Sequence, residues 1–316
     1  MPKFLTFALP QSPFFMEKTT QNALPCVAAI GTFDGIHRGH QAVFDKMREV
    51  AQLRGAASRI ITFANHPLSV LCPDKAPKWV NPRLRNNAEL ARYADFVSVM
   101  DFTPDLAALT AAEFLRQIRE QYGVGVLVMG PNNTFGSDCL KAHADYVAAG
   151  REAGVEVVFA DAVTTADGRL LSSTRLRDDI ALAALDDFGE IAGTDFAISG
   201  TVVHGKRLGH SIGIPTINID VPDDVADLPD GVYAGSTVLP DGRRFISVMS
   251  IGNNPTVRGG RRTHEVHVIG HDIGETYGQE VAFFPRRRIR DICAFDSLDD
   301  LKRQIQDDIA SASEAF

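Results

Sequence analysis

Two histidines, His37 and His40, stand at the end of a glycine-rich turn. The turn, Gly31 to Gly39 (G-T-F-D-G-I-H-R-G), separates the apolar run 26–30 from the amphipathic segment 41–53. This order predicts a strand, a turn and a helix, and the start of a helix suits phosphate because it offers free N–H groups. Histidines three residues apart lie on one face of the first helical turn. They could donate hydrogen bonds to phosphoryl oxygens there and stabilise the charge that develops during attack at phosphorus.

Three simpler interpretations of this pair remain open. A His-x-x-His pair can form half of a metal site, although no later Cys or His pair has the spacing of metal ligands. The glycines could do no more than mark a turn. The histidines could also be solvated residues at a helix start, so the pair alone does not fix a function.

Two further segments of the first half offer ligand-binding side chains. The segment 130–136 (G-P-N-N-T-F-G) follows a continuous apolar run, and its polar side chains could hydrogen-bond a ring ligand on which Phe135 stacks. A surface turn rich in Asn and Gly is the alternative. The segment 172–177 (S-S-T-R-L-R) opens a helix, where Arg177 could grip phosphate in fork geometry. A plain helix cap would explain one hydroxyl there, but not the arginines.

The second half contains a loop with glycines at four-residue intervals, Gly205, Gly209 and Gly213. Glycines let a loop backbone approach phosphates closely, with its N–H groups forming an anion nest. Thr216 and Asn218 alternate along an extended segment, so both oxygens point to one side and could hold Mg²⁺ beside a nucleotide. The Gly-Lys-Ser/Thr order of a Walker loop is missing. A flexible connection in a β-hairpin is the alternative.

The elements that must position these residues differ between the two halves. Strand-like runs at 26–30, 59–63, 96–100, 124–129 and 155–160 alternate with helical patterns at 41–53, 110–122 and 142–153. This alternation predicts an α/β domain with a doubly wound parallel sheet. From residue 198 onward, short strand-like runs (200–204, 231–239, 245–251, 265–269 and 280–286) are separated by turns, which predicts an all-β barrel or sandwich.

We therefore predict two unlike domains, residues 1–186 and 187–316. Residues 1–25 read as an irregular lead-in, and a final helix over 298–309 has a plausible cap at Ser297.

Composition excludes several classes of protein. The net charge of −8 over 316 residues argues against broad nucleic-acid binding. The four cysteines lie far apart without a C-x-x-C pair, which indicates reduced thiols and a cytoplasmic location. No apolar run approaches the length that spans a membrane, and the first residues do not resemble a signal peptide. We expect neither a nucleic-acid nor a membrane partner, and a homo-oligomer is left open.

Taken together, the motifs of the first half resemble those of the prokaryotic FAD synthetases of the nucleotidyltransferase superfamily. Gly31 to His40 is similar to the string G-x-F-D-G-x-H-x-G-H, 172–177 to S-S-T-x-x-R, and 63–67 to F-x-x-H-P. The flavin-side loop resembles G-x-N-F-T-F-G, except that Asn133 replaces the first Phe. The resemblance implies that His37 and His40 bind the ATP phosphates. It further implies nucleotide contacts from Gly31, Phe33, Asp34, Gly39, Ser173, Thr174 and Arg177, and flavin contacts from His66, Asn132, Thr134 and Phe135.

The glycine loop of the second half is similar to the riboflavin kinase loop G-x-x-x-G-x-x-x-G-F-P-T-A-N, with Ile214 and Ile217 in place of Phe and Ala. Downstream, 251–256 resembles I-G-x-x-P-T, and 265–278 resembles an E-V-H…Y-G block. The resemblance implies that Glu265 is the base that takes the proton of the riboflavin 5′-hydroxyl. It further implies that the nucleotide lies on Gly205, Lys206, Gly209 and Gly213 and the metal on Thr216 and Asn218. A solvated strand residue is the alternative for Glu265.

The resemblance spans both halves and implies a bifunctional transferase, a riboflavin kinase and FMN adenylyltransferase that uses ATP with Mg²⁺. The second domain would convert riboflavin to FMN, and the first would convert FMN to FAD with release of pyrophosphate. The implied folds are a Rossmann-like nucleotidyltransferase domain and an antiparallel β-barrel with a terminal helix.

Two other functions remain open. One is a monofunctional riboflavin kinase with a scaffold domain, which Asn133 keeps under consideration. The other is a flavin-binding regulator without chemistry, against which the retained residues argue: His37, His40, Thr216, Asn218 and Glu265.

Overall fold

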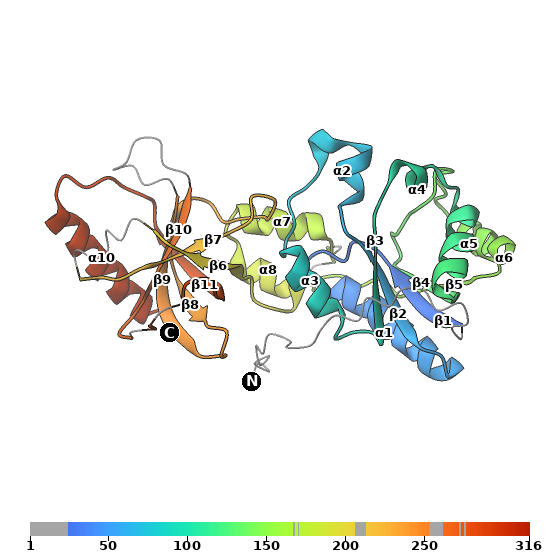
Figure 1. Cartoon of the computed structure of the whole chain (residues 1–316), viewed down its shortest axis with the longest axis horizontal. Helices are drawn as coiled ribbons and strands as arrows, with labels where there is room; N and C mark the ends of the chain where they lie inside the picture. Colours follow the sequence, from blue (N-terminus) through green and yellow to red (C-terminus); the bar gives the residue numbers. More distant parts are fainter. Residues whose placement is uncertain are drawn as a thin grey trace. The chain divides into compact units, whose positions relative to one another are not determined.

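The structure is a computed structural model that describes residues 25–166, 168–169, 171–205, 213–252, 262–271, 273–274 and 276–316. The chain divides into two compact units, residues 25–175 and 176–316 of the described part (Figure 1). Most of the predicted lead-in, and Lys206 and Gly209 of the glycine loop, lie outside the described residues. The domain boundary expected after residue 186 stays a prediction.

The first unit is built on a five-stranded sheet in the order β3-β2-β1-β4-β5. Its strands are β1 (Cys26–Ile30), β2 (Ser58–Phe63), β3 (Phe96–Met100), β4 (Val124–Met129) and β5 (Glu156–Phe159). All neighbouring strands are parallel, as the alternation of elements predicts. The chain fills one side of β1 first and then crosses to β4, so the strand order reverses between β1 and β4. Ligands of open α/β sheets bind at the carboxyl ends of the strands beside such a reversal.

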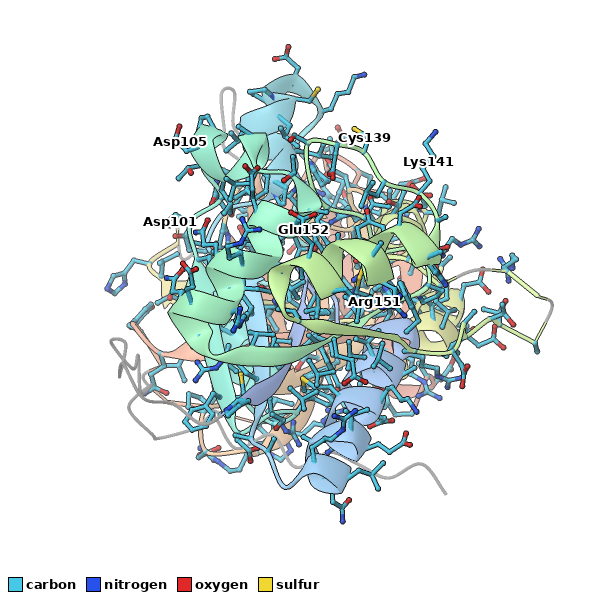
Figure 2. All side chains as sticks on the ribbon, turned by 90° about the vertical axis from the view of Figure 1, so that its right-hand side faces the viewer. Asp101, Asp105, Cys139, Lys141, Arg151 and Glu152 are labelled. Atoms are coloured by element: carbon cyan, nitrogen blue, oxygen red, sulfur yellow. The ribbon has the colours of Figure 1, made fainter. Side chains whose placement is uncertain are left out.

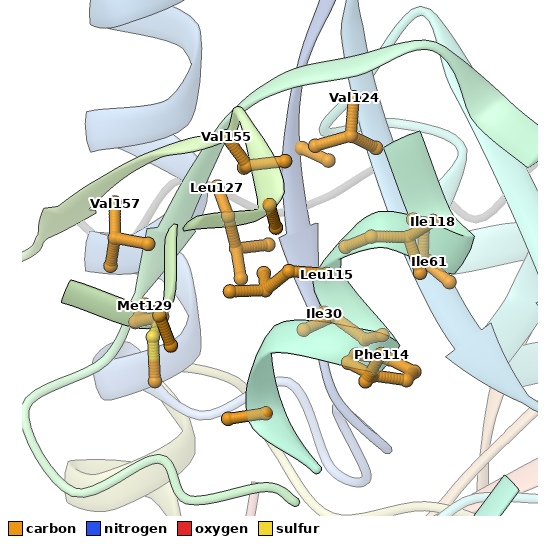
Figure 3. Packing of buried hydrophobic residues seen from close by; sticks show 14 of the residues in the cluster. Ile30, Ile61, Phe114, Leu115, Ile118, Val124, Leu127, Met129, Val155 and Val157 are labelled. Atoms are coloured by element: carbon orange, nitrogen blue, oxygen red, sulfur yellow. The ribbon is translucent and has the colours of Figure 1, made fainter. Parts of the chain in front are cut away.

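Helices cover both faces of this sheet because its central strands are apolar on both faces. The helices are α1 (Arg38–Arg54), α2 (Pro67–Leu71), α3 (Arg83–Leu90), α4 (Pro104–Ala108), α5 (Ala111–Tyr122) and α6 (His143–Ala153), with a 3₁₀ turn η1 (Pro73–Lys75). On one face, Val27 and Ala29 of β1 share a core with Phe44 and Met47 of α1. On the other face, Ile30 belongs to a core that includes Leu115 and Ile118 of α5 (Figure 3).

The outward surfaces of α4 and α6 carry charged side chains, among them Asp105, Arg151 and Glu152 (Figure 2). Arg116 of α5 and Glu152 form an ion pair at 3.5 Å, with side chains that are 43% and 68% exposed. Exposed pairs of this kind contribute little to stability, so the apolar cores hold these helices to the sheet.

The second unit is a closed antiparallel barrel in the order β10-β7-β6-β11-β8-β9. Its strands are β6 (Ile198–Val203), β7 (Ile217–Asp220), β8 (Gly231–Val238), β9 (Arg244–Gly252), β10 (Thr263–Val268) and β11 (Glu280–Arg290). Helices α7 (Ser173–Ala181) and α8 (Leu185–Ala192) precede the barrel, and α10 (Leu298–Ser313) follows it. The all-β prediction is confirmed in its barrel form.

Helix α10 is attached to the barrel by apolar packing and by one buried ion pair. Ala312 and Ile309 pack against Val232 of β8 and its neighbours. Arg290 of β11 donates from Nε and Nη2 to the two carboxylate oxygens of Asp308, at 2.9 and 2.7 Å. Ser297 accepts a hydrogen bond from the N–H of Asp300, which confirms the predicted helix cap.

Replacing Asp308 by alanine should destabilise the second unit. The Asp308 side chain is 3% exposed, so its loss leaves the Arg290 guanidinium without its partner in a largely dry place. Breaking a buried pair in this way costs about 3 kcal/mol of unfolding free energy. Urea denaturation followed by far-UV circular dichroism measures the change. The matched control is Arg303→Ala on the same helix, where the side chain is 71% exposed and we expect no measurable effect. Equal effects of the two substitutions would contradict the interpretation.

Candidate active sites

The loop between β1 and α1 folds into a tight turn with an uncommon backbone. Phe33 and Ile36 have positive φ angles of 46° and 39°, a conformation that costs free energy for residues other than glycine. Both side chains are buried, at 1% and 5% exposure, and belong to the core that α1 shares with the sheet. Packing therefore holds the turn in this strained form.

Asp34 ties this turn to two distant parts of the first unit. Its buried carboxylate accepts hydrogen bonds from the backbone N–H of Val80, at 3.0 and 2.9 Å, and from that of Asn81 at 3.3 Å. Its backbone carbonyl accepts a hydrogen bond from Ser173 Oγ at 2.7 Å. Asp34 thus brings the start of α7 to the turn, and its own predicted contact with the nucleotide stays a prediction.

His37 and His40 lie together at the start of α1. His37 is the N-cap, and its Nδ1 accepts a hydrogen bond from the backbone N–H of His40 at 3.3 Å. The two rings stack with their centroids 3.7 Å apart, and the edge of Phe33 packs against His40. A Cβ at Gly39 would lie only 3.0 Å from His37 Nδ1, so a small residue is needed beneath the cap. The helix begins at Arg38, three residues earlier than the amphipathic pattern predicts.

Burial keeps both histidines neutral near pH 7. It lowers the pKa of His37 from its usual value of 6.5 to about 4. Burial, and secondarily the neighbouring His37, hold the pKa of His40 well below its usual value. Because Nδ1 of His37 accepts a hydrogen bond, the proton of the neutral ring lies on Nε2, which can act as a donor. The Nδ1 atom of His40 is shielded from water and has no hydrogen-bond partner among the described residues. The pair can thus offer hydrogen bonds to an anion without carrying charge itself.

The start of α7 divides its hydroxyl groups between two tasks. Ser172 accepts a hydrogen bond from the N–H of Arg175 at 3.2 Å, which is an ordinary helix cap. Ser173 instead donates to the carbonyl of Asp34. Thr174 is exposed and Arg177 is half-buried. The cap therefore explains Ser172, and the structure brings Ser173 to the histidine turn.

The loop after β4 exposes Asn132 and Thr134, two residues predicted to contact a flavin. Phe135 packs in the other direction, with its ring centroid 5.1 Å from that of Phe114 and 5.0 Å from that of Tyr146. Asn133 also turns inward and donates from Nδ2 to the carbonyl of Ile30 at 3.4 Å. The structure thus gives Phe135 a packing role, and its stacking on a flavin stays a prediction.

Two aromatic residues that the motifs do not include hold this loop. The Tyr146 hydroxyl accepts from the N–H of Phe135 at 3.1 Å and lies within hydrogen-bond distance of the carbonyls of Phe135 and Leu140. His143 donates from Nε2 to the carbonyl of Pro131 at 3.0 Å while its ring stacks on Phe159. No local pattern marks such residues, because their role depends on tertiary contacts.

The histidine of the His-Pro pair caps a short helix. His66 Nδ1 accepts a hydrogen bond from the N–H of Leu68 at 3.1 Å, at the start of α2. Its ring meets the edge of Trp79 at a centroid distance of 5.5 Å. Trp79 directly precedes Val80, whose N–H reaches Asp34. His66 and the histidine turn are therefore linked through one short segment.

The barrel places the predicted kinase residues on adjacent strands. Glu265 of β10 pairs with Asn218 of β7 on one side and with Ser250 of β9 on the other. Side chains of directly paired residues lie on the same face, so Glu265 and Asn218 are neighbours. A Cβ at Gly205 would lie 2.0 Å from Nδ2 of Asn218, so any other residue there would displace the Asn218 amide. The structure thus brings Gly205, Asn218 and Glu265 together.

The segment leading into β7 contains Gly213 and Thr216. Gly213 has a φ angle of 78°, which favours glycine, and Thr216 is half-buried. Thr216 directly precedes β7 and lies two residues before Asn218, so the expectation that the two side chains share a face stays a prediction. His267 donates from Nδ1 to the carbonyl of Pro215 at 2.8 Å. His267 belongs to the E-V-H motif, but its partner cannot be read from the sequence.

A partly buried polar cluster lies next to Glu265 in the chain. His264 Nε2 is 2.7 Å from Asp227 Oδ2, and Arg262 reaches the same oxygen at 2.6 Å. Arg262 also contacts Asp230 at 2.9 Å. This cluster anchors the start of β10 to the segment before β8. Among the described residues, no group of three or more His, Cys, Asp or Glu side chains could hold a metal ion.

Replacing His37 by asparagine should weaken the pH dependence of stability. The folded protein keeps His37 neutral down to about pH 4, whereas the unfolded chain binds its proton near pH 6.5. The stability that this residue contributes is therefore full above pH 6.5 and is lost as the pH falls toward 4. An asparagine side chain at this position would keep the cap acceptor but would not titrate.

Urea denaturation at about pH 7 and about pH 4.5 tests this, because the unfolding free energy falls most steeply with pH between these two values. We expect a smaller loss of stability in the variant than in the unmodified protein. The matched control is Gln52→Asn, an exposed and non-titrating residue of the same helix, which should keep the original pH dependence. An unchanged pH dependence in His37→Asn would contradict the assignment.

Among the described residues, no helix is long and apolar enough to cross a membrane.

Comparison with known proteins adds an independent result for each unit. The FAD synthetase family model matches residues 19–175, and the riboflavin kinase family model matches residues 192–316. The bifunctional riboflavin kinase/FMN adenylyltransferase of Escherichia coli K12 is 34% identical over 301 residues, which cover 92% of this chain and 93% of that protein. The protein of the same name from Pseudomonas fluorescens is 34% identical over 289 residues, covering 91% and 92%.

A solved structure resembles the whole fold. It is titled a macrolide-efflux protein from Streptococcus pneumoniae, with a TM-score of 0.79, 29% identity and coverage of 92% of this chain and 95% of that one. That title describes the other protein, and the likeness here concerns sequence and fold. With both family models matched in order and relatives that extend over nearly its full length, the chain belongs to the family of bifunctional riboflavin kinases/FMN adenylyltransferases.

Proposed function

We propose that this chain makes both flavin nucleotides: it phosphorylates riboflavin to FMN in the second unit and adenylylates FMN to FAD in the first. Family membership supports both reactions. The observation that carries the proposal is that each unit offers the groups its reaction needs. The first unit has two neutral histidines at the start of a helix. The second has the carboxylate of Glu265 beside the amide of Asn218, which the backbone of Gly205 approaches closely.

In the first unit, a phosphate oxygen of FMN attacks the α-phosphorus of ATP. The new P–O bond forms as the bond to the β-phosphate oxygen breaks, and pyrophosphate leaves with the electron pair. Negative charge grows on the phosphoryl oxygens and on the leaving group. Nε2–H of His37, the ring of His40 and the N–H groups at the start of α1, which lie together at the N-cap, would donate hydrogen bonds to these oxygens. Such donors act without a covalent intermediate, by positioning and electrostatic stabilisation.

In the second unit, Glu265 takes the proton of the riboflavin 5′-hydroxyl as that oxygen attacks the γ-phosphorus of ATP. The O–P bond to riboflavin forms, the bond to the β–γ bridging oxygen breaks, and ADP leaves. The carboxylate holds the proton until solvent removes it. A carboxylate base suits this step because it accepts a proton without adding positive charge to the site. Asn218 pairs directly with Glu265 and can orient the groups around it.

Transferases of this kind use a divalent metal ion with ATP. We assign Mg²⁺ and the side-chain oxygens of Thr216 and Asn218 as its protein ligands in the kinase unit. Neutral oxygen donors that share one face fit Mg²⁺, which takes only one or two protein ligands and fills its shell with water and phosphate oxygens. When bound, the ion neutralises phosphate charge during transfer.

The remaining assignments follow the motifs of the family. The proposed nucleotide contacts are Gly31, Phe33, Asp34, Gly39, Ser173, Thr174, Arg177, Gly205, Lys206, Gly209 and Gly213, and the proposed flavin contacts are His66, Asn132, Thr134 and Phe135. We further propose domains of residues 1–186 and 187–316 and a cytoplasmic location, which four free cysteines support. ATP, riboflavin and FMN are the expected small-molecule partners. The chain has no proposed nucleic-acid or membrane partner, and a homo-oligomer is left open.

A monofunctional riboflavin kinase is the second candidate, and Asn133 favours it. This residue stands where the family variant has Phe, and its side chain donates to the carbonyl of Ile30. The first unit therefore lacks one aromatic group that could pack on a flavin. In this case the first unit would serve as a scaffold.

Chromatography of the products separates the candidates. The purified protein is incubated with Mg-ATP and riboflavin, and separately with Mg-ATP and FMN. FAD in both reactions is the expected result. FMN that accumulates without FAD would favour the monofunctional kinase, and no turnover in either reaction would favour a non-catalytic flavin-binding regulator.

Replacing His40 by alanine should abolish FAD formation and spare FMN formation. The substitution removes one donor to the transition-state charge, and the loss of such a donor lowers kcat by about 10²–10³-fold. Rates of FAD formation from FMN and of FMN formation from riboflavin provide the two readings. Glu152→Ala serves as the control because the Glu152 side chain is 68% exposed on α6 of the same unit and is assigned to neither site. Loss of both activities in His40→Ala would argue against independent sites.

Replacing Glu265 by glutamine should have the reverse effect. Glutamine keeps the size of the side chain but cannot accept the hydroxyl proton, so kinase turnover should fall by about 10²–10⁴-fold. FAD formation from supplied FMN should stay unchanged in the same preparation. Glu280→Gln, an exposed glutamate on β11, is the control. An unaffected kinase would remove Glu265 as the base.

A further inference from the structure

We propose that His267 is a positioning residue of the riboflavin kinase site. Through its hydrogen bond to the carbonyl of Pro215, it holds Thr216 in place against the strand that carries Glu265. The inference rests on the proposed kinase function of the second unit. It assigns to His267 a task in metal and nucleotide placement, not in the transfer itself.

The hydrogen bond joins two segments that are far apart in the chain. His267 Nδ1 lies 2.8 Å from the carbonyl oxygen of Pro215, and the two residues are 52 positions apart. A carbonyl oxygen can only accept, so Nδ1 carries the proton.

Strand register explains why a side chain is needed at this point. The ladder between β10 and β7 consists of the pairs Glu265–Asn218 and Val266–Ile217. Strand β7 begins at Ile217, so the ladder ends there. The next residues toward the N-terminus are Thr216 and Pro215, and proline has no N–H to donate. The His267 ring joins the two segments beyond the end of the ladder, because it donates a hydrogen bond to the carbonyl oxygen of Pro215.

The same register places four side chains on one face. Glu265 and His267 lie on one side of β10 because side chains alternate along a strand. Asn218 faces Glu265, and continuing the same register by one residue beyond Ile217 sets Thr216 opposite His267. His267 therefore flanks Thr216 as Glu265 flanks Asn218. The proposed base, the proposed metal ligands and His267 are therefore neighbours on two adjacent segments of the barrel.

No other hydrogen bond fixes this part of the segment. Within the portion of the chain that the structure describes, neither Pro215 nor Thr216 makes a further hydrogen bond. Asn218 is held by the strand ladder and is enclosed by Gly205. The position of the Thr216 hydroxyl thus depends on the bond from His267. Groups that orient a metal ligand in this way commonly affect metal affinity or activity by about 10–100-fold.

The test compares His267→Ala, His267→Phe and His267→Asn in the full-length protein. Asparagine places its Nδ2–H where the imidazole carries Nδ1–H, since both nitrogens are bonded to Cγ. Phenylalanine keeps the ring volume without a donor. The matched control is His271→Ala, because His271 is an exposed histidine of the same unit. Kinase rates are measured across a range of Mg²⁺ concentrations, and FAD formation from supplied FMN is measured in the same samples.

We expect His267→Ala and His267→Phe to need about 10-fold more Mg²⁺ for half-maximal kinase rate, with a similar fall in kcat. His267→Asn should stay within about twofold of the unmodified protein, because it restores the donor. FAD formation and the His271→Ala control should not change. The difference between Asn and Phe separates a hydrogen-bonding task from simple filling of space.

Three results would overturn the proposal. The first is an unchanged Mg²⁺ requirement and kcat in both His267→Ala and His267→Phe. The second is a fall in kcat with an unchanged Mg²⁺ requirement and a lower melting temperature in all three variants, which would assign His267 to folding alone. The third is failure of His267→Asn to restore what His267→Phe loses. Absence of FMN formation by the unmodified protein would instead refute the proposed kinase function itself, and the inference with it.

Discussion

A buried carboxylate must find hydrogen-bond donors, and this constraint organises the first unit around Asp34. The carboxylate has no exposure to water, so its charge is compensated by the backbone N–H groups of Val80 and Asn81. Those donors belong to the segment between η1 and α3, and Ser173 meets the Asp34 carbonyl from α7. Three stretches that are distant in sequence thereby converge on the turn that presents His37 and His40.

The second unit is subject to a different constraint, which is the lack of space for a side chain at position 205. The amide of Asn218 occupies the space in which any side chain at Gly205 would lie. Strand register fixes Asn218 beside Glu265, so the glycine is what permits the backbone at Gly205 to approach the pair closely. The two units thus reach the same end by different means. The first unit surrounds the Asp34 carboxylate with hydrogen-bond donors, and the second has a glycine at position 205 where a side chain would collide with Asn218.

The elements that carry the sites could be predicted because their patterns are local. The central strands β1 and β4 are apolar on both faces, and the glycine turn after β1 marks where α1 starts. Ser297 marks the start of α10 in the same way, through an ordinary cap. The motifs also identify Glu265 and Asn218 through their likeness to a family. Spacing alone does not pair them, since they lie 47 positions apart.

What could not be predicted depends on contacts between distant segments. The packing of Phe135 against Phe114 and Tyr146 follows from how α5 and α6 meet, and no local pattern announces it. His143 and His267 each donate to the carbonyl of a proline, and neither partner can be read from neighbouring residues. The strain at Phe33 and Ile36 also escapes a pattern-based prediction, because positive φ angles are uncommon for such residues.

The neutral state of the histidine pair has a thermodynamic consequence for binding. An anion bound against His37 and His40 would favour their protonated forms, because its charge offsets the cost of burying an imidazolium. Binding of such an anion and proton uptake would then be reciprocally linked, so the affinity for the anion would rise as the solution becomes more acidic. The heat released on binding would accordingly vary with the ionisation enthalpy of the buffer that supplies the protons. A site built from permanently charged lysines would show no such dependence.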